Sequence, residues 1–208
     1  MVTRLEIINH MLFTIGEQVQ NTLETMHPSV TQAQAILTSV DKDFQGRGWW
    51  FNKEYEITLA LNELGQIIVP ESAMSVEVVA CSAAPLANRN QYAVRGNKIY
   101  DAVNHTFTIA GPLVCNIVIQ LDIEDLPHSA GTYVKHMAAE AMHTDDDGDT
   151  KGKGEKLAER VMLAWHNLKA EELKVANINA LNSPHAAQLR YRMTQAMAPS
   201  NPRLLGGR

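Results

Sequence analysis

Three side chains in the second half of the chain have the spacing of a metal site on a helix. His136, Glu140 and His143 stand at positions i, i+4 and i+7, so a helix would place them on one face. Imidazole nitrogens and a carboxylate arranged in this way can hold a divalent metal, which activates water for hydrolysis. The HExxH pattern is absent, and with eight histidines in the chain such a spacing also arises by chance. A metal-dependent hydrolase that uses these three residues is therefore one alternative.

An acidic run follows directly, Asp145-Asp146-Asp147-Gly148-Asp149. An EF-hand loop has an acid at its first position, Gly at the sixth and Glu at the twelfth. With Gly148 at the sixth position, His143 takes the first and Gly154 the twelfth, so both ends of the loop fail. The run is better interpreted as a solvated loop between helices.

Motifs for nucleophilic catalysis or phosphate binding are missing. The chain has no GxSxG, no GxxxxGK[ST] and no GxGxxG, and Gly152-Lys153-Gly154 is too short for a phosphate loop. Ser129-Ala130-Gly131-Thr132 fits the start of a helix better than a nucleophile. We therefore expect no enzyme, no catalytic residue, no metal and no cofactor.

The composition is that of a globular protein. The chain has 208 residues, 45% of them hydrophobic and 20% charged, and a net charge of −5 that excludes a generic polyanion binder. Cys81 and Cys115 form no CxxC, so we expect two reduced, buried thiols, although a single bridge stays open. No apolar run is long enough to span a bilayer, and the first twenty residues lack the features of a signal peptide. We expect a soluble protein made inside a cell.

The first part of the chain predicts two helices. Thr3 and Glu6 form a capping box before an apolar stripe that stops at Gly16. Ser29 and Gln32 form a second box before another stripe. The helices predicted in this way span residues 3–15 and 30–46.

The middle of the chain predicts a β module of six or seven strands over residues 49–123. Arg95-Gly96-Asn97-Lys98 has the composition of a hairpin turn. The segments rich in β-branched and aromatic residues are Trp49–Phe51, Tyr55–Leu59, Ile67–Val69, Val76–Val79, Tyr92–Val94, Ile99–Asp101, Thr106–Ile109 and Val114–Ile119. Trp49 and Trp50 stand at the junction with the preceding helix, where they fit a structural role better than a partner contact.

Two more helices follow, which sets the fold class. Pro127 fits a helix start, the acidic run ends that helix, and a long helix begins near Glu155. The order predicts an α+β fold, an antiparallel helical bundle from N- and C-terminal helix pairs with an inserted antiparallel β module and an extended C-terminal tail. The domains expected are 1–47 and 126–181 (helical bundle), 48–125 (inserted β domain) and 182–208 (docking tail).

The tail predicted at residues 182–208 contains four arginines and no acidic residue. Ser183 and Pro184 fit a helix start, and apolar side chains share one face of that helix. The expected partner-binding residues are the apolar anchors Leu189, Met193, Leu204 and Leu205 and the ionic partners Arg190 and Arg203. A nucleic-acid-binding module acting through this tail is a second alternative, although Tyr191 is its only aromatic residue.

Several segments together carry a family resemblance, of which Arg47-Gly48-Trp49-Trp50-Phe51-Asn52 is the most specific. The matching pieces are Glu6–Asn9, Ile15–Glu17, Thr22–Glu24, Ala35–Leu37, Gly46–Asn52, Glu56–Leu59 and Asp122–Pro127. In this order and spacing they resemble the tail tubular protein A family of short-tailed bacteriophages, the head-to-tail adaptors. The resemblance covers residues 5–60 and 120–175.

The resemblance implies a structural virion protein. Such adaptors form a twelve-membered ring between the portal protein and the tail nozzle (tail tubular protein B), and the ring supports tail fibre attachment. The ring continues the DNA ejection channel and encloses double-stranded DNA without sequence-specific binding. It also implies assembly in the host cytoplasm, a place at the head–tail interface of the virion and no membrane partner. In the family the helical part faces the portal and the β part faces the nozzle.

Overall fold

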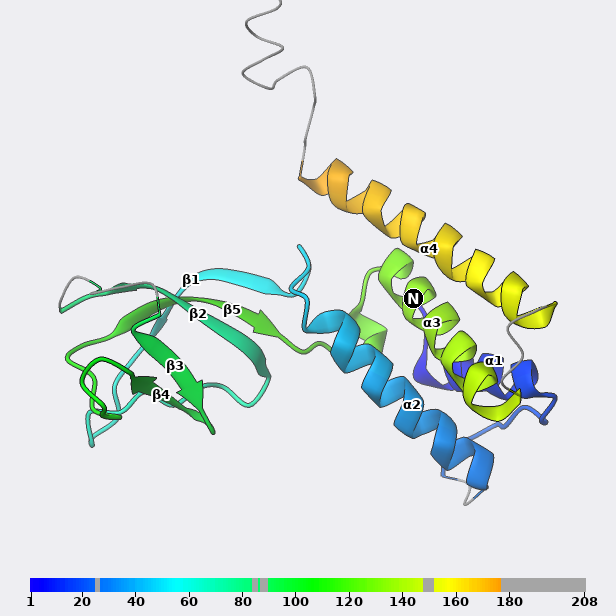
Figure 1. Ribbon diagram of the computed structural model, residues 1–208, viewed down its shortest axis with the longest axis horizontal. Helices are drawn as coiled ribbons and strands as arrows, with labels where there is room; N and C mark the ends of the chain where they lie inside the picture. Colours follow the sequence, from blue (N-terminus) through cyan, green and yellow to red (C-terminus); the bar gives the residue numbers. More distant parts are fainter. Residues whose placement is uncertain (25–26, 84–85, 87–89, 148–151, 177–208) are drawn as a thin grey trace, which may run out of the picture. The chain divides into compact units, whose positions relative to one another are not determined.

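The structure is a computed structural model that describes residues 1–24, 27–83, 86, 90–147 and 152–176 (Figure 1). Its elements follow one another as helices, then strands, then helices. They are α1 (Arg4–Ile15), α2 (Pro28–Gln45), β1 (Lys53–Leu59), β2 (Ala73–Cys81), β3 (Tyr92–Arg95), β4 (Lys98–Asp101), β5 (Leu113–Ile119), the 3-10 helix η1 (Ile123–Asp125), α3 (His128–Asp147) and α4 (Lys153–Val175). Within the described residues, no helix is both long and apolar enough to cross a bilayer.

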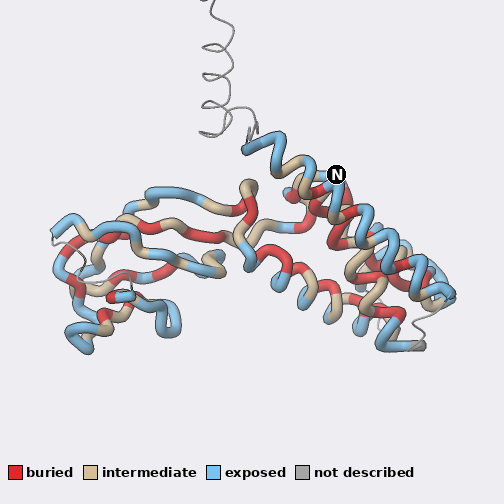
Figure 2. Tube along the Cα trace, turned by 45° about the horizontal axis from the view of Figure 1, so that its top comes forward, coloured by how far each residue is buried: buried red, intermediate tan, exposed pale blue. Residues whose placement is uncertain are grey.

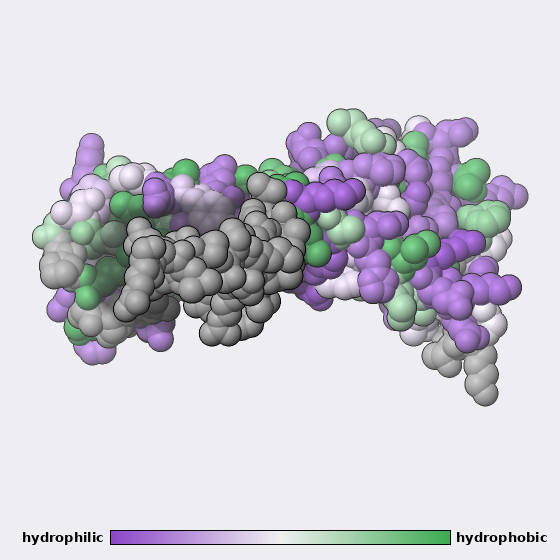
Figure 3. Space-filling model, turned by 90° about the horizontal axis from the view of Figure 1, so that it is seen from above, coloured by the Kyte–Doolittle hydropathy of each residue, from purple (hydrophilic) through white to green (hydrophobic). Residues whose placement is uncertain are grey.

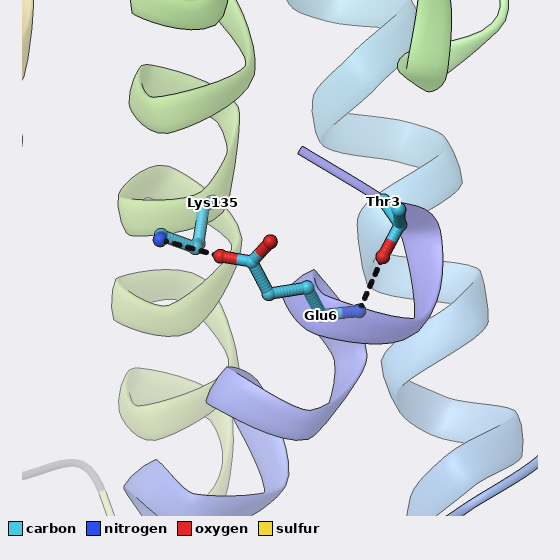
Figure 4. Close-up of polar contacts among 3 residues, drawn as sticks. All are labelled: Thr3, Glu6 and Lys135. Atoms are coloured by element: carbon cyan, nitrogen blue, oxygen red, sulfur yellow. Dashed lines mark hydrogen bonds and ion pairs between the residues drawn. The ribbon is translucent and has the colours of Figure 1, made fainter. Parts of the chain in front are cut away.

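The start of α1 confirms half of the predicted capping box. The Thr3 side chain accepts a hydrogen bond from the backbone N–H of Glu6 at 3.2 Å. The Glu6 carboxylate does not turn back to the cap; it accepts from Lys135 Nζ of α3 at 3.1 Å (Figure 4). The predicted reciprocal bond was wrong because a cation from another helix takes the carboxylate.

The end of α1 lies at Gly16, as predicted. Gly16 has a φ of 85°, in the left-handed region where a side chain is strained. The N–H of Glu17 donates to the carbonyl of Leu12 at 2.9 Å, and that of Gly16 to Phe13 at 3.2 Å. These two bonds define a Schellman motif, which satisfies the last carbonyls of the helix.

The second predicted capping box, at Ser29 and Gln32, was wrong. The helix α2 begins earlier, at Pro28, and His27 precedes it without a side-chain cap. The Ser29 hydroxyl instead donates to the Glu17 carboxylate at 3.5 Å. Proline at the first helical position explains the earlier start, because its missing N–H has no partner there anyway.

The acidic run was predicted to end the third helix, and the structure places that end later. Asp145, Asp146 and Asp147 still belong to α3. Gly148 and Asp149 lie outside the described residues. The fourth helix begins at Lys153, two residues before the predicted start.

The helices share one hydrophobic core. Residues from α1, α2 and α3 form it, and Ala164 and Leu168 of α4 add to it. Its largest fully buried side chains in the α-helices are Ile7, Ile8, Met11, Leu12, Leu37, Met142 and Leu168, and Ile123 of η1 joins them. Buried positions recur at helical spacing along α1, α2 and α3, as expected for amphipathic helices that pack together, and Figure 2 shows buried positions among exposed ones in the helical part.

The strands lie between α2 and α3 in the chain and form two antiparallel sheets. The larger sheet has the order β1-β5-β2, and β3 pairs with β4 in a hairpin. The turn of that hairpin is Gly96-Asn97, with a φ of 63° at Gly96, so the hairpin prediction is confirmed. A second core of apolar residues from these strands and their loops includes Leu59, Ile67, Val69, Ile99, Ile109, Leu113, Cys115 and Ile117.

Three predicted strands are not regular strands. Trp49–Phe51 forms a turn after α2, and its aromatic side chains pack against the helical core. Residues 67–69 and 106–109 contribute only the isolated bridges Ile68–Lys98 and Thr106–Asp101. Aromatic and β-branched residues favour burial on a sheet, but a buried turn satisfies the same preference. The mixed arrangement of helices and antiparallel sheets confirms the α+β class.

Candidate interaction surfaces

A buried polar joint fixes the end of α2 to the segment that follows β5. The Gln45 side chain is fully buried, and its amide donates to the carbonyl of Leu121 at 2.9 Å and accepts from the N–H of Leu121 at 2.8 Å. Its amide nitrogen also donates to Asp41 Oδ1 at 2.8 Å. Burial raises the pKa of Asp41, while hydrogen bonds from Gln45 and Gln120 act in the opposite direction. Gln45 thus pairs with the backbone of Leu121 as a neighbouring strand would.

Asn52 completes this joint. Its Oδ1 accepts from the N–H of Trp49 at 2.7 Å, and its Nδ2 donates to the carbonyls of Gln45 and Ile119, each at 3.0 Å. Asn52 is 1% exposed. One side chain therefore ties α2, the turn before β1 and the end of β5 together.

Trp49 packs beside the joint, in the role predicted for it. It is 4% exposed, and its indole N–H donates to the carbonyl of Phe44 at 2.8 Å. Its ring lies parallel to Phe51 and meets Trp165 of α4 edge-on, with ring centroids 5.6 Å apart. Trp50 is half-buried against the same core. These contacts make Trp49 a structural residue and leave it no open face for a partner.

A groove opens beside this cluster, between α2, α3 and α4. Two hollows, of about 360 and 130 Å³, share Arg47 and Tyr133. We name this surface the Arg47 groove; its further lining residues are Val40, Asp43, Phe44, Met137, Glu140, Ala158, Val161, Met162 and Trp165. Met162 is 62% exposed at its edge. The groove is largely apolar with a few charges, the usual composition of a surface that receives a peptide or side chain.

A third hollow, of about 240 Å³, lies between α1 and the start of α4. We name it the basic pocket; it is lined by His10, Phe13, Thr14, Lys153, Lys156, Leu157 and Arg160. Lys153 donates to the carbonyl of Thr14. Within the described residues, no carboxylate lies within 4.0 Å of the cationic groups of Lys156 or Arg160. The pocket therefore presents cations that no described side chain neutralises.

The edge strand β1 carries a bulge. Tyr55 and Glu56 together oppose the single residue Asn116 of β5, and Glu56 has a φ of 56°. The Asn116 side chain accepts from the N–H of Glu56 at 3.2 Å, which holds the bulge. As a result Glu54, Tyr55 and Glu56 are all exposed, and Tyr55 is 63% exposed. We refer to these three residues as the β1 bulge.

His136, Glu140 and His143, the residues of the alternative metal site, do not form a ligand set in the described structure. Among the described residues, no three His, Cys, Asp or Glu side chains gather in a way that could hold a metal. His136 packs edge-on against His10, with ring centroids 5.5 Å apart. Burial lowers the pKa of His136 to about 4, helped by the positive charges of His10, Lys135 and Arg160. His143 is 2% exposed, and among the residues that the structure describes neither of its ring nitrogens has a hydrogen-bond partner.

The structure does not test the predicted docking residues, but it does test the prediction for the two cysteines. Leu189, Arg190, Met193, Arg203, Leu204 and Leu205 lie outside the described residues. Both cysteines are free thiols, but only Cys115 is buried, while Cys81 is half-buried at the end of β2. Burial raises the pKa of the Cys115 thiol to about 11.

Sequence reasoning missed the polar joint. Asp41 and Gln45 stand at i and i+4 next to the apolar stripe of α2, and this position is the one signal that could have indicated their burial. Some partners of Gln45 and Asn52 are near in sequence, but Leu121, which pairs with Gln45, lies 76 positions away, and Ile119, which pairs with Asn52, lies 67 positions away. No local pattern encodes such a contact.

The comparisons with known proteins agree with the resemblance. A family model described as tail tubular protein matches residues 5–181. Tail tubular protein A of Klebsiella phage KP34 is 28% identical over 145 residues, which cover 69% of this chain and 73% of that protein. These matches define the chain as a structural protein of a bacteriophage tail and so as a component of the virion. It belongs to the tail tubular protein family, as the sequence resemblance predicted.

Proposed function

We propose that this tail protein is the head-to-tail adaptor of its phage. Twelve copies form a ring between the portal protein and the tail nozzle, tail tubular protein B. The ring continues the channel through which the double-stranded DNA leaves, and its outer surface supports tail fibres. The protein acts at the head–tail interface of the virion, after assembly in the host cytoplasm, and performs no chemistry.

The observation that carries this proposal is the presence of exposed apolar side chains on both the helical and the β part. Phe13 and Leu163 are 72% and 64% exposed on helices, and Leu64 is 72% exposed in the loop after β1. On the face drawn in Figure 3, apolar side chains stand among hydrophilic ones in several places. A ring subunit needs several docking faces, because it meets two neighbours at its sides and other proteins along the axis.

We assign different partners to the two parts of the chain, because each part has its own hydrophobic core. We assign residues 1–47 and 126–181 to a helical bundle that meets the portal, and 48–125 to a β domain that meets the nozzle. The polar joint of Gln45 and Asn52 supports this role, since it ties the two parts together with buried hydrogen bonds. Residues 182–208 form the docking tail, with Leu189, Met193, Leu204 and Leu205 as apolar anchors and Arg190 and Arg203 as ionic partners.

Negative-stain imaging of the purified protein mixed with the portal protein of the same phage tests the proposal. We expect a symmetric collar on one end of the portal ring and a mass increase of about twelve subunits. The portal alone and the adaptor alone are the controls. A mixture that stays as bare portal and monomeric adaptor at micromolar concentrations contradicts the proposal.

A further inference from the structure

The β1 bulge has the features of a contact point. A glutamate in the left-handed region strains the backbone, and such strain is found where the surrounding structure maintains it for a purpose. The bulge interrupts pairing on an edge strand and leaves Tyr55 exposed next to the acidic residues Glu54 and Glu56 in the sequence, which are exposed as well. Lys53 Nζ lies 5.4 Å from the centre of the Tyr55 ring, which covers one side of it. A tyrosine held in this way is a typical anchor of a protein interface.

The basic pocket has the complementary chemistry. Lys153, Lys156 and Arg160 bring positive charge to its rim, and the Phe13 ring beside them is 72% exposed. The β1 bulge thus offers two exposed acidic residues and an exposed aromatic residue, and the basic pocket offers cations and an exposed aromatic residue. Aromatic pairs and opposite charges are what specific interfaces bring together.

We propose that the β1 bulge of one subunit docks into the basic pocket of a neighbouring copy of the same chain. This inference rests on the proposed ring function and names the side-to-side contact in it. The two surfaces are different, so the contact is heterologous, and repeated contacts of this kind close a ring when the rotation between subunits allows it. Tyr55 packs against Phe13, and Glu54 and Glu56 pair with Lys156 and Arg160.

Zero-length cross-linking tests the contact directly. Carbodiimide joins a carboxylate to a lysine only when the two are in ion-pair contact. We would mix equal amounts of isotopically normal and nitrogen-15-labelled protein, assemble the mixture on the portal, cross-link it and identify the joined peptides by mass spectrometry. Peptides that join Glu54 or Glu56 to Lys156 and combine both isotopes support the proposal.

Charge reversal gives a second readout. We expect Glu54→Lys/Glu56→Lys and Lys156→Glu/Arg160→Glu each to lower the yield of rings at least about tenfold, and the combination of both to restore most of it. The matched control Glu63→Lys/Glu71→Lys reverses two other exposed charges of the β part and keeps the wild-type yield. Circular dichroism and thermal unfolding confirm that each variant folds.

The outcomes are distinguishable. Rings that form on the portal without the mixed-isotope peptides, or that tolerate both reversals, overturn this contact and leave the ring function intact. A wild-type protein that forms no ring overturns both proposals. Binding of duplex DNA that is lost in Lys156→Glu/Arg160→Glu while rings still form assigns the pocket to phosphate instead, and this also overturns the contact.

Discussion

At the scale of single residues, Asn52 holds together segments that are distant in sequence. Its side chain satisfies the N–H of Trp49 and the carbonyls of Gln45 and Ile119, and it is almost fully buried. Because a buried polar group left without a partner costs about 1–3 kcal/mol, truncating this side chain exposes several groups to that cost at once.

We therefore predict that Asn52→Ala lowers the free energy of unfolding by about 3 kcal/mol. The measurement is equilibrium urea unfolding followed by circular dichroism. Asn62→Ala is the matched control, since Asn62 accepts from two backbone N–H groups in an exposed turn, where water replaces the lost bonds. Equal losses of stability in the two variants would show that burial of the joint is not what makes Asn52 important.

His136 predicts a pH dependence of stability. Its pKa is about 4 in the folded protein against 6.5 for the free side chain, so protonation favours the unfolded state. The stability that depends on a neutral His136 is complete above pH 6.5 and is lost as the pH falls toward 4. The pKa of His10, its ring partner, is also lowered, chiefly by burial. The raised pKa of Asp41 acts in the opposite direction and is common to all variants compared.

We expect His136→Phe to flatten the decline of unfolding free energy between pH 6.5 and 4.5. Phenylalanine keeps a ring against His10 but cannot take up a proton. Urea unfolding at several pH values measures the difference between variant and wild type, which should grow as the pH falls. His166→Phe on an exposed position of α4 is the control and should follow the wild type. Parallel curves for His136→Phe and wild type count against the assignment.

At the scale of elements, two glycines with positive φ allow the cost of backbone strain to be compared with the cost of steric crowding by an added side chain. Gly16 ends α1 with a φ of 85°, and an added Cβ would meet no atom within 4 Å. Gly48 lies in the turn after α2 with a φ of 73°, and an added Cβ would come within 2.9 Å of Val118 Cγ2. Both positions strain an L side chain, but only Gly48 also lacks the space for one.

The prediction is that Gly16→Ala costs about 1 kcal/mol of stability and Gly48→Ala about 2 kcal/mol or more. Thermal unfolding and urea titration of the two variants give the comparison. A third variant, Gly48→Ala combined with Val118→Ala, removes the clash and should bring the cost of the added Cβ back toward that at Gly16. If the two single variants are equally stable, packing of the turn against β5 is looser than the structure shows.

A helix or strand could be predicted from the sequence where the residues that decide it lie close together in the chain. Gly16 ended a helix as predicted, because a left-handed end is a property of one residue and its neighbours. The Glu6 half of the capping box failed, because Lys135 competes for the carboxylate from 129 residues away. The strand predicted at Trp49–Phe51 failed for a related reason: the aromatic rings report burial, and burial beside Phe44 and Trp165 needs no sheet. The α+β class survived these errors, since it depends only on the order of the elements.

At the scale of the whole molecule, the described part of the chain contains two hydrophobic cores, one among the helices and one among the strands. The helical core and the β core both lie within residues 1–168. The sequence identified the tail by its charge, four arginines and no acidic residue, which indicates a partner but not its surface. Folding and docking are therefore expected to be separable in this protein.

We predict that removing residues 182–208 changes the melting temperature by less than about 3 °C and abolishes stable attachment to the portal. The reason is that the proposed ring of twelve subunits would repeat each weak tail contact twelve times, so the loss of these contacts affects assembly far more than the fold of one subunit. Thermal unfolding measures the first effect, and co-sedimentation with portal rings measures the second. Leu204→Ser/Leu205→Ser should reproduce most of the assembly defect, whereas Gln188→Ala/Gln195→Ala, two polar changes in the same segment, should not. A truncated protein that still decorates the portal would place the attachment on the helices, with the Arg47 groove as the first surface to test.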